Sequence, residues 1–189
     1  MRMIARAFAG LRKARFALRS AALRSYLRMA YPGVRVHRSV IFGKGVTVRA
    51  FDGAQLEIGE GTVVLEYAQL QVEGGSLVIG NNCLVGRGTV VVCSERIEIG
   101  DGTLIAEHVT IRDQDHNHRG DGRLVSQGST TAPIRIGHDV WLGAKVTVTK
   151  GVEIAHHAVV GANAVVTTSL PVRGVYVGAP ARLLSRQDS

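Results

Sequence analysis

Aliphatic residues recur at every sixth position through most of this chain. The longest in-phase series comprises Ile136, Leu142, Val148, Ile154, Val160, Val166 and Val172. A second small or aliphatic residue stands four positions after most of these, at Val140, Val146, Val152, Ala158, Ala164 and Leu170. Shorter series occur upstream, at Ile58, Val64 and Leu70, at Ile79, Val85, Val91 and Ile97, and at Ile99, Ile105 and Ile111. A period of six fits neither the 3.6-residue period of a helix nor the two-residue period of a strand.

This period is typical of a solenoid in which each hexapeptide forms one short strand and one turn. Three hexapeptides close a triangular coil of about 18 residues, and the coils stack at roughly the 4.8 Å spacing of neighbouring strands. Each inward side chain contributes roughly 1.5 to 3 kcal/mol when buried. The segments Gly80-Asn81-Asn82 and Gly161-Ala162-Asn163 predict corners, where these residue types tolerate positive φ. Phase slips after Leu70 and after Ile97 predict small bulges at corners.

Residues 1–33 follow a different pattern, which predicts an amphipathic helix. Most of the apolar positions recur at helical spacing: Ile4, Ala7, Phe8, Leu11, Ala14, Leu18 and Ala22. Three others fall on the opposite side, at Phe16, Leu23 and Leu27. The segment also carries eight basic residues: Arg2, Arg6, Arg12, Lys13, Arg15, Arg19, Arg24 and Arg28. The first acidic residue is Asp52, and residues 34–189 carry 15 basic and 15 acidic side chains, so the net charge of +8 comes from this segment.

Three roles remain open for the basic helix. Residues 1–30 could lie on an anionic membrane surface, because burial of apolar residues adds to roughly 1 kcal/mol for each basic residue near the lipid. The helix could instead pack on its own domain or on a neighbouring subunit. An Arg-rich, acid-free start also resembles a mitochondrial transit peptide. Arginines interrupt any signal-peptide core, so we expect a cytoplasmic protein that can lie peripherally on the inner face of the membrane. Because only 5% of the residues are aromatic, we expect no nucleic-acid partner.

Between Ile111 and Ile134 the six-residue rhythm stops, and residues 112–133 form a polar stretch that cannot belong to the core. Long loops that leave a rigid scaffold are usually functional or disordered. This one contains His116, and an unperturbed imidazole titrates close enough to neutral pH to act as a general base. Asp113 or Asp115 could orient its ring and stabilise the imidazolium.

The hexads resemble the [LIV]-[GAED]-x-x-[STAV]-x signature of the hexapeptide-repeat acyltransferases, within which the maltose, galactoside and surface-polysaccharide O-acetyltransferases are most similar. The resemblance covers residues 34–184, with residues 1–33 as the basic helical segment and 185–189 as a short tail. It implies a left-handed parallel β-helix, an all-β fold. It also implies acetyl-CoA as cosubstrate and a homotrimer that binds both substrates between subunits.

The resemblance assigns the catalytic base to His116, which stands five residues after Ile111 as the family's catalytic histidine does. His118 does not match that position, and it either contacts the substrate or binds nothing. The family's sugar-binding asparagine and aspartate correspond here to Gly86 and Ser94. We therefore expect a different acceptor, a lipid-linked or polymeric saccharide rather than a small free sugar.

Three C-terminal segments resemble the family's acetyl-CoA site: residues 139–144, 161–168 and 178–182. The candidate cofactor contacts within them are Trp141, Gly143, Ala144, Gly161, Ala162, Thr167, Thr168 and Arg182. Small residues allow the pantetheine arm to lie along the coils, and Arg182 offers a cation to a phosphate. Tight corner packing explains Gly143 and Gly161 equally well, and Trp141 could pack at a corner.

We expect no metal and no disulfide. Cys83 and Cys93 lie in apolar runs without the spacing of a zinc or redox motif, so both are interpreted as reduced and structural. A zinc carbonic anhydrase resembles this fold, but its histidine spacing is absent among His108, His138, His156 and His157. The remaining function classes are a saccharide O-acetyltransferase, an N-acetyltransferase of an amino sugar, or a non-catalytic scaffold. The residue 112–133 loop and the CoA-like segments argue against the scaffold.

Overall fold

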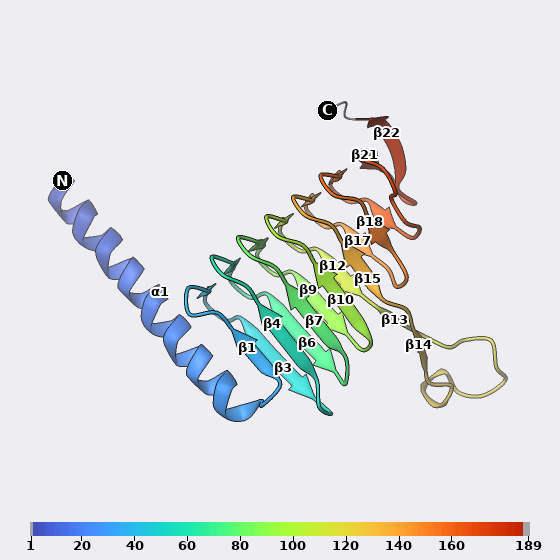
Figure 1. Cartoon of the computed structure of the whole chain (residues 1–189), viewed down its shortest axis with the longest axis horizontal. Helices are drawn as coiled ribbons and strands as arrows, with labels where there is room; N and C mark the ends of the chain where they lie inside the picture. Colours follow the sequence, from blue (N-terminus) through green and yellow to red (C-terminus); the bar gives the residue numbers. More distant parts are fainter. Residues whose placement is uncertain (1, 187–189) are drawn as a thin grey trace.

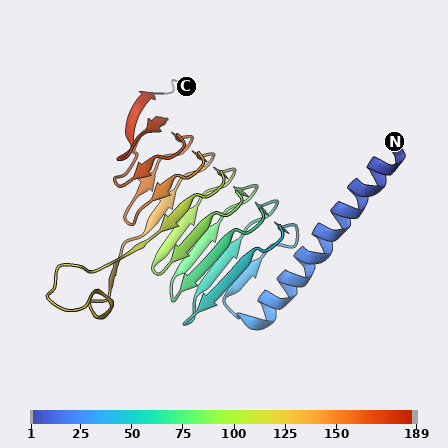
Figure 2. The ribbon, with the colours of Figure 1, turned by 180° about the vertical axis from the view of Figure 1, so that it is seen from behind.

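The computed structural model of the chain describes residues 2–186, with side chains described from residue 16 onward. One helix, α1 (Arg2–Ala30), precedes a stack of β-coils that continues to the C-terminal end, and one long loop leaves the stack (Figures 1 and 2). The predicted class, an all-β solenoid with an N-terminal helix, is confirmed.

Each coil contributes one strand to each of three sheets, which form the faces of a prism. The first face contains β1 (Val34–Val36), β4 (Gln55–Ile58), β7 (Ser76–Ile79), β10 (Arg96–Ile99), β15 (Ile134–Ile136) and β18 (Glu153–Ile154). The second face contains β2 (Ile41–Phe42), β5 (Val63–Val64), β8 (Leu84–Val85), β11 (Leu104–Ile105), β16 (Trp141–Leu142), β19 (Val159–Val160), β21 (Gly174–Val177) and β22 (Arg182–Arg186). The third face contains β3 (Thr47–Phe51), β6 (Gln69–Glu73), β9 (Val90–Cys93), β12 (Thr110–Arg112), β17 (Thr147–Val148) and β20 (Val165–Val166). Neighbouring strands on these faces are parallel, except for the antiparallel pair of β21 and β22.

The inward positions of all three faces form one hydrophobic core. On the first face Ile58, Ile79, Ile99, Ile136 and Ile154 pair in succession, and each is at most 3% exposed. Every residue predicted as a six-residue anchor is buried in this way except one. Because every coil buries the same inward contacts against the next coil, these contacts together stabilise the solenoid.

Val172, the exception, is only partly buried and lies outside the strands. Leu170 pairs with Ile154 in its place, and Tyr176 pairs with Val160. The last coil is therefore shorter than the coils before it. The Tyr176 hydroxyl donates a hydrogen bond to the Val172 carbonyl at 2.8 Å, which holds the shortened segment against the core.

Coil length also changes at the N-terminal end. The spacing between paired residues on the first face falls from 22 (Val34 to Leu56) to 20 (Leu77 to Ile97) and then to 18 (Ile136 to Ile154). The extra residues lengthen strands, since β6 has five residues and β7 four, whereas β17 and β18 have two each. Pairing in the longer coils stays in register. The prediction of corner bulges at the phase slips was therefore wrong.

The predicted corners are confirmed. Asn82 and Asn163 have φ values of 54° and 61°, in the left-handed region that asparagine tolerates better than most residues. At the C-terminal end, β22 extends to Arg186, so residues 185 and 186, which were expected in a tail, belong to a strand. The rest of the predicted tail, residues 187–189, lies outside the described part.

One side of α1 packs on the first coil. Leu27 is 1% exposed and Ser20 is 2% exposed. The Ser20 hydroxyl accepts the N–H of Phe42 at 2.9 Å, and Arg24 donates to the Val40 carbonyl at 2.6 Å. These side chains satisfy backbone groups that have no preceding coil to pair with. Among residues 16–30, the helix therefore docks on its own domain, as one of the three interpretations proposed.

Candidate active site

The loop that leaves the prism begins and ends as a hairpin. Strands β13 (Gln114–His116) and β14 (Ser129–Thr131) pair antiparallel, and a short 3-10 helix, η1 (Leu124–Ser126), lies shortly before β14. The Gln127 side chain accepts the N–H of Gly120 at 2.9 Å and donates to the Gly122 carbonyl at 2.7 Å. The loop is thus held by its own polar groups rather than by a hydrophobic core.

Asp113 forms the root of this loop. Its side chain is fully buried, and its carboxylate accepts the N–H groups of Ser94 at 2.7 Å and of Glu95 and Arg96 at 2.9 Å. One coil earlier, the N–H of Ser76 donates instead to the Glu95 carbonyl above it. Because the loop replaces the corner that would lie above residues 94–96, the Asp113 carboxylate supplies the missing acceptors.

This geometry corrects the expected role of the two aspartates beside His116. Asp113 points into the prism and is used by backbone N–H groups. Asp115 lies next to His116 on β13, where successive side chains point to opposite sides. Its carboxylate is 3.3 Å from the Lys150 ammonium. The structure therefore brings neither carboxylate to the ring of His116.

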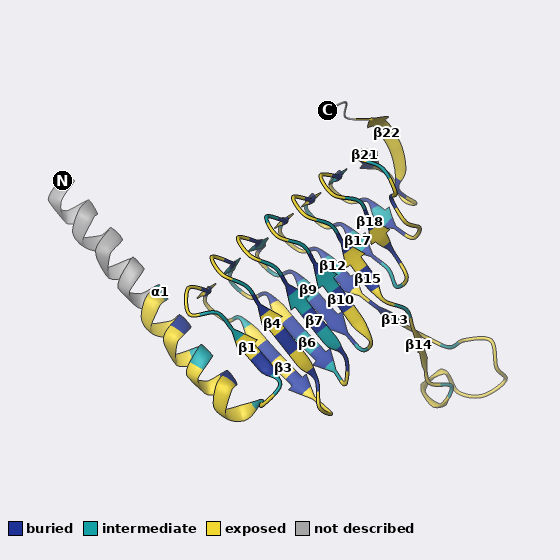
Figure 3. Cartoon of the chain, viewed as in Figure 1, coloured by how far each residue is buried: buried dark blue, intermediate teal, exposed yellow. Residues whose placement is uncertain are grey.

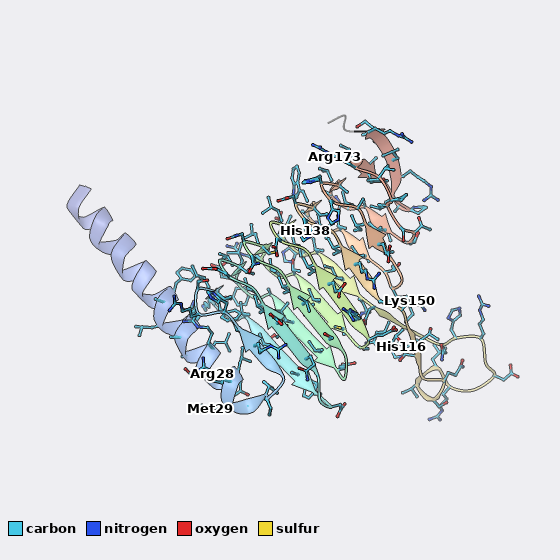
Figure 4. The ribbon with its side chains drawn as sticks, viewed as in Figure 1. Arg28, Met29, His116, His138, Lys150 and Arg173 are labelled. Carbon is cyan, nitrogen blue, oxygen red and sulfur yellow. The ribbon has the colours of Figure 1, made fainter. Side chains whose placement is uncertain are left out.

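His116 has an exposed side chain at the end of β13, where the loop leaves the prism (Figure 4). It lines a pocket of about 330 Å³ with Arg112, Gln114 and Asp115. It also lines a neighbouring pocket of about 610 Å³ that reaches Lys150. No hydrogen bond joins its ring to another residue within the described chain. The imidazole nitrogens are therefore open to a substrate.

Lys150 is a site residue that the sequence interpretation missed. It follows β17, one coil beyond the loop, and its ammonium donates to the Thr130 hydroxyl at 2.9 Å. With the Asp115 contact, this ties both strands of the hairpin to the prism. A register argument could have found it, because Ile111 pairs with Val148 and Lys150 then lies level with Asp113.

The three candidate acceptor contacts lie in different surroundings. His118 is exposed in the loop, with Nδ1 3.4 Å from the His116 carbonyl oxygen. Ser94 is half-buried at the corner beside Asp113, and its hydroxyl lies 3.5 Å from the Glu73 carboxylate. At Gly86 an added Cβ would lie 2.2 Å from the Ala106 carbonyl oxygen. Gly86 is therefore required by close coil packing and offers no side chain to an acceptor.

The small candidate cofactor residues stack at one corner, between the second and third faces. The N–H of Asn163 donates to the Ala144 carbonyl at 2.8 Å, which sets Ala162 directly beyond Ala144. A Cβ at Gly143 would meet the Ala162 nitrogen at 2.7 Å, and one at Gly161 would meet Val177 at 2.9 Å. Packing therefore accounts for both glycines. Ala144 is half-buried and Ala162 is exposed, so the side chains at this corner are small.

The other cofactor candidates are divided between faces. Thr167 and Thr168 are exposed at the opposite edge of the third face, one coil beyond Lys150. Trp141 is 53% exposed on the second face. Arg182 is exposed on β22, and its guanidinium donates to the Ala181 carbonyl at 2.9 Å. The structure thus brings His116, Lys150 and the two threonines to one edge of the third face, and the alanines to its other edge.

Two further histidines and the two cysteines have structural partners. His138 and His156 stack with ring centroids 4.8 Å apart, and their Nδ1 atoms accept the N–H groups of Asp101 and His138 respectively. Burial raises the pKa of the Cys83 thiol, and burial together with the Asp113 charge raises the pKa of Cys93 to about 12. Both cysteines are free and buried. The described residues contain no cluster of three or more metal-ligating side chains.

Comparison with known proteins agrees with this architecture. Residues 133–168 match the model of the bacterial transferase hexapeptide family (six repeats). A probable acetyltransferase of Mycobacterium tuberculosis is 36% identical over 165 residues, covering 85% of this chain and 54% of that protein. The galactoside O-acetyltransferase of Escherichia coli is 33% identical over 115 residues, covering 59% of this chain and 54% of that protein. The chain thus spans about half the length of these curated relatives.

Among solved structures, AntD, an N-acyltransferase from Bacillus cereus in complex with a dTDP-amino sugar and coenzyme A, has a TM-score of 0.73. It is 18% identical, and the match covers 88% of this chain and 90% of AntD, so the likeness concerns the fold. AntD and a hexapeptide-repeat acetyltransferase from Vibrio cholerae are left-handed parallel β-helices, which confirms the predicted fold class. Repeat, fold and sequence similarity together show that the chain belongs to the hexapeptide-repeat transferases.

Proposed function

We propose that this protein transfers an acetyl group from acetyl-CoA to a hydroxyl group of a saccharide, with His116 as general base. The observation that carries this proposal is the placement of His116: an unpaired, exposed imidazole where the loop leaves the coils, in a pocket that reaches Lys150. The named acetyltransferases among the relatives support the reaction class. At 33% identity, the galactoside enzyme favours a hydroxyl over an amine as acceptor.

His116 performs the proton transfers in this scheme. A ring nitrogen of His116 accepts the hydroxyl proton while the oxygen bonds to the acyl carbonyl carbon. The resulting imidazolium returns that proton to the sulfur when the carbon–sulfur bond breaks, so the histidine ends neutral. Bound acetyl-CoA supplies the acyl group as an activated thioester. Lys150, paired with Asp115 and Thr130, holds the hairpin that carries His116 in place.

The third face and its two edges fit the donor. The stacked Ala144 and Ala162 corner allows close approach of a narrow chain, because neither residue projects beyond Cβ. Thr167 and Thr168 offer hydroxyl groups at the other edge, and Arg182 offers a cation at the C-terminal end of the stack. These residues would hold the pantetheine arm and a phosphate of acetyl-CoA.

The candidate acceptor contacts and the pockets beside His116 indicate the kind of acceptor. Gly86 has no side chain to offer and Ser94 is neutral, so the contacts that family members use for a small sugar are lacking. The pockets beside His116 are open at the surface, lined by loop residues that are mostly exposed. Such a site suits one residue of a longer or lipid-linked saccharide. We therefore propose a role in surface-polysaccharide or lipid-linked glycan synthesis.

A homotrimer is part of this proposal, and the second face supports it. The outward position of that face is apolar in seven successive strands: Ile41, Val63, Leu84, Leu104, Trp141, Val159 and Val175. The outward positions of the first face include charged residues, among them Arg35, Glu57 and Glu98. A contiguous apolar ladder indicates an interface with a neighbouring subunit. Such packing would cover Trp141 and enclose the alanine corner beside it.

The test measures free thiol released from acetyl-CoA with a panel of neutral saccharides, amino sugars and polysaccharide fragments. Products are analysed by mass spectrometry and by mild alkaline hydrolysis, which removes O-acetyl but not N-acetyl groups. Thiol release with neutral saccharides and an alkali-labile product would support the proposal. Alkali-stable products from amino sugars alone would make the protein an N-acetyltransferase. Absence of turnover and of CoA binding would indicate a scaffold.

A further inference from the structure

The two sides of α1 have different surroundings. Leu27 and the half-buried Leu23 face the first coil, whereas Leu18 and Met29 are 72% and 79% exposed. At about 100° per residue, Leu18, Ala22 and Met29 fall on one line, opposite the line that contains Ser20 and Leu27. The outer side of the described half is accordingly exposed along its length (Figure 3).

The helix has two apolar series of residues, and the one on the outer side is the more regular. The series that starts at Ile4 and Leu11 continues through Leu18 and Ala22. Since α1 is one uninterrupted helix from Arg2 to Ala30, that series keeps a single register along it. The coils are contacted by the other, shorter series. The two members of the longer series whose side chains are described, Leu18 and Ala22, are both exposed.

Charge restricts what could cover this side. Residues 1–30 hold eight basic residues and no acidic ones, whereas the rest of the chain has 15 Lys and Arg and 15 Asp and Glu. In the described half, the exposed Arg19 and Arg28 flank the line of Leu18 and Met29 on either side. A second copy of the helix would bring like charge onto like charge. The complementary surface is therefore both apolar and anionic.

We propose that the outer side of α1, defined by Leu18, Ala22 and Met29 with Arg19 and Arg28, docks on the surface of an anionic lipid bilayer. The apolar line enters the boundary between headgroups and acyl chains, and the arginines pair with lipid phosphates. No helix within the described part of the chain is long and apolar enough to span a membrane. Because the exposed apolar residues form a line along one side of the helix, the helix axis lies in the plane of the surface in this proposal. This inference does not depend on the proposed transfer reaction.

The structure also decides how the test is designed. Removing residues 1–30 would delete Leu27 and Ser20, which cover and cap the first coil, so a truncated chain could lose binding by unfolding. Leu18→Glu changes only the outer side. Leu184→Glu is the matched control, since Leu184 is 67% exposed on β22 at the other end of the stack. The full-length proteins are sedimented with phosphatidylcholine vesicles with or without about 30% phosphatidylglycerol.

The wild-type chain and Leu184→Glu should bind the anionic vesicles, and both should dissociate as salt rises to about 0.5 M. Leu18→Glu should reduce the partition coefficient about tenfold or more while its thermal unfolding stays unchanged. No binding by the wild type, or equal binding by both variants, would overturn the inference. A change in sedimentation velocity of Leu18→Glu without a change in vesicle binding would also overturn it, because it would assign the outer side to a second copy.

Discussion

The coils and the loop between β12 and β15 differ in what stabilises them. In the coils, backbone groups pair one coil away and aliphatic side chains fill a continuous core. In the loop, most side chains are exposed and amide side chains such as Gln127 bond to nearby backbone. The loop joins the coils through few contacts, of which Asp113 and Lys150 are the most specific. The prism therefore holds a polar loop whose sequence is not constrained by core packing and can supply catalytic residues.

The largest effect on stability is expected at the root of the loop. Asp113→Ala leaves three N–H groups, those of Ser94, Glu95 and Arg96, without an acceptor. A hydrogen bond to a charged group contributes about 1.5–3 kcal/mol, and less where it is only partly buried, as all three are here. The free energy of unfolding should therefore fall by about 3 kcal/mol. Urea unfolding measures it, with the exposed Asp115→Ala as control, for which a change within about 0.5 kcal/mol is expected. Equal losses in both variants would refute the root role of Asp113.

A truncation in the core should cost far more than one in the loop. Ile105 is fully buried on the second face, so Ile105→Ala should lower the free energy of unfolding by about 2 to 5 kcal/mol. Leu124 is 59% exposed in η1, so Leu124→Ala should change it by about 0.5 kcal/mol or less. Thermal or urea unfolding measures the free energy of unfolding of both variants and of the wild type. A large loss for Leu124→Ala would mean that the loop is part of the core.

A smaller effect is expected where Lys150 ties the hairpin to the prism. Lys150→Met removes the contacts to Thr130 and Asp115, which are partly exposed and worth about 1 kcal/mol or less. Amide hydrogen exchange in residues 114–131 should become faster, while exchange in the coils stays the same. Lys145→Met, at another corner of the same coil, serves as control. Unchanged exchange in the hairpin would contradict the anchoring role.

The smallest effect concerns the two thiols. Burial together with the Asp113 charge raises the pKa of Cys93 to about 12, from 9.0. At pH 8 its thiolate fraction is then about a thousandfold lower than that of an exposed cysteine. Cys93, like the buried Cys83, should react with an alkylating reagent only after denaturation. Rapid labelling of the native protein, measured by mass spectrometry, would mean that the core opens readily.

The six-residue period predicted the coils because each inward position has the same buried surroundings as the equivalent position in the next coil. Ile136, Leu142 and Val148 could be assigned from spacing alone. Spacing fails where a strand lengthens, as in β6, or where the last coil shortens, so that Leu170 replaces Val172. These changes in coil length shift the register, but the inward residues stay aliphatic. A fixed period of six therefore does not predict them.

The candidate site was only partly predictable. The interruption of the period located the loop and its histidines. It could not show that Asp113 points inward, because an aspartate next to a catalytic candidate suggests an orienting role whatever its direction. Lys150 was missed because its contacts join residues 20 and 35 positions apart in sequence, across a coil boundary. Gly86 and Gly143 owe their identity to close coil approach rather than to a ligand.

The central claim is that the loop carries the chemistry through one histidine. It is tested most directly by kcat/KM for acetyl transfer in His116→Ala and His118→Ala, two exposed histidines of one loop. His116→Ala should lose about 10²-fold or more in kcat, with no change in unfolding, whereas His118→Ala should at most change KM for the acceptor. Full turnover in His116→Ala, or equal loss of kcat in both variants, would contradict the claim.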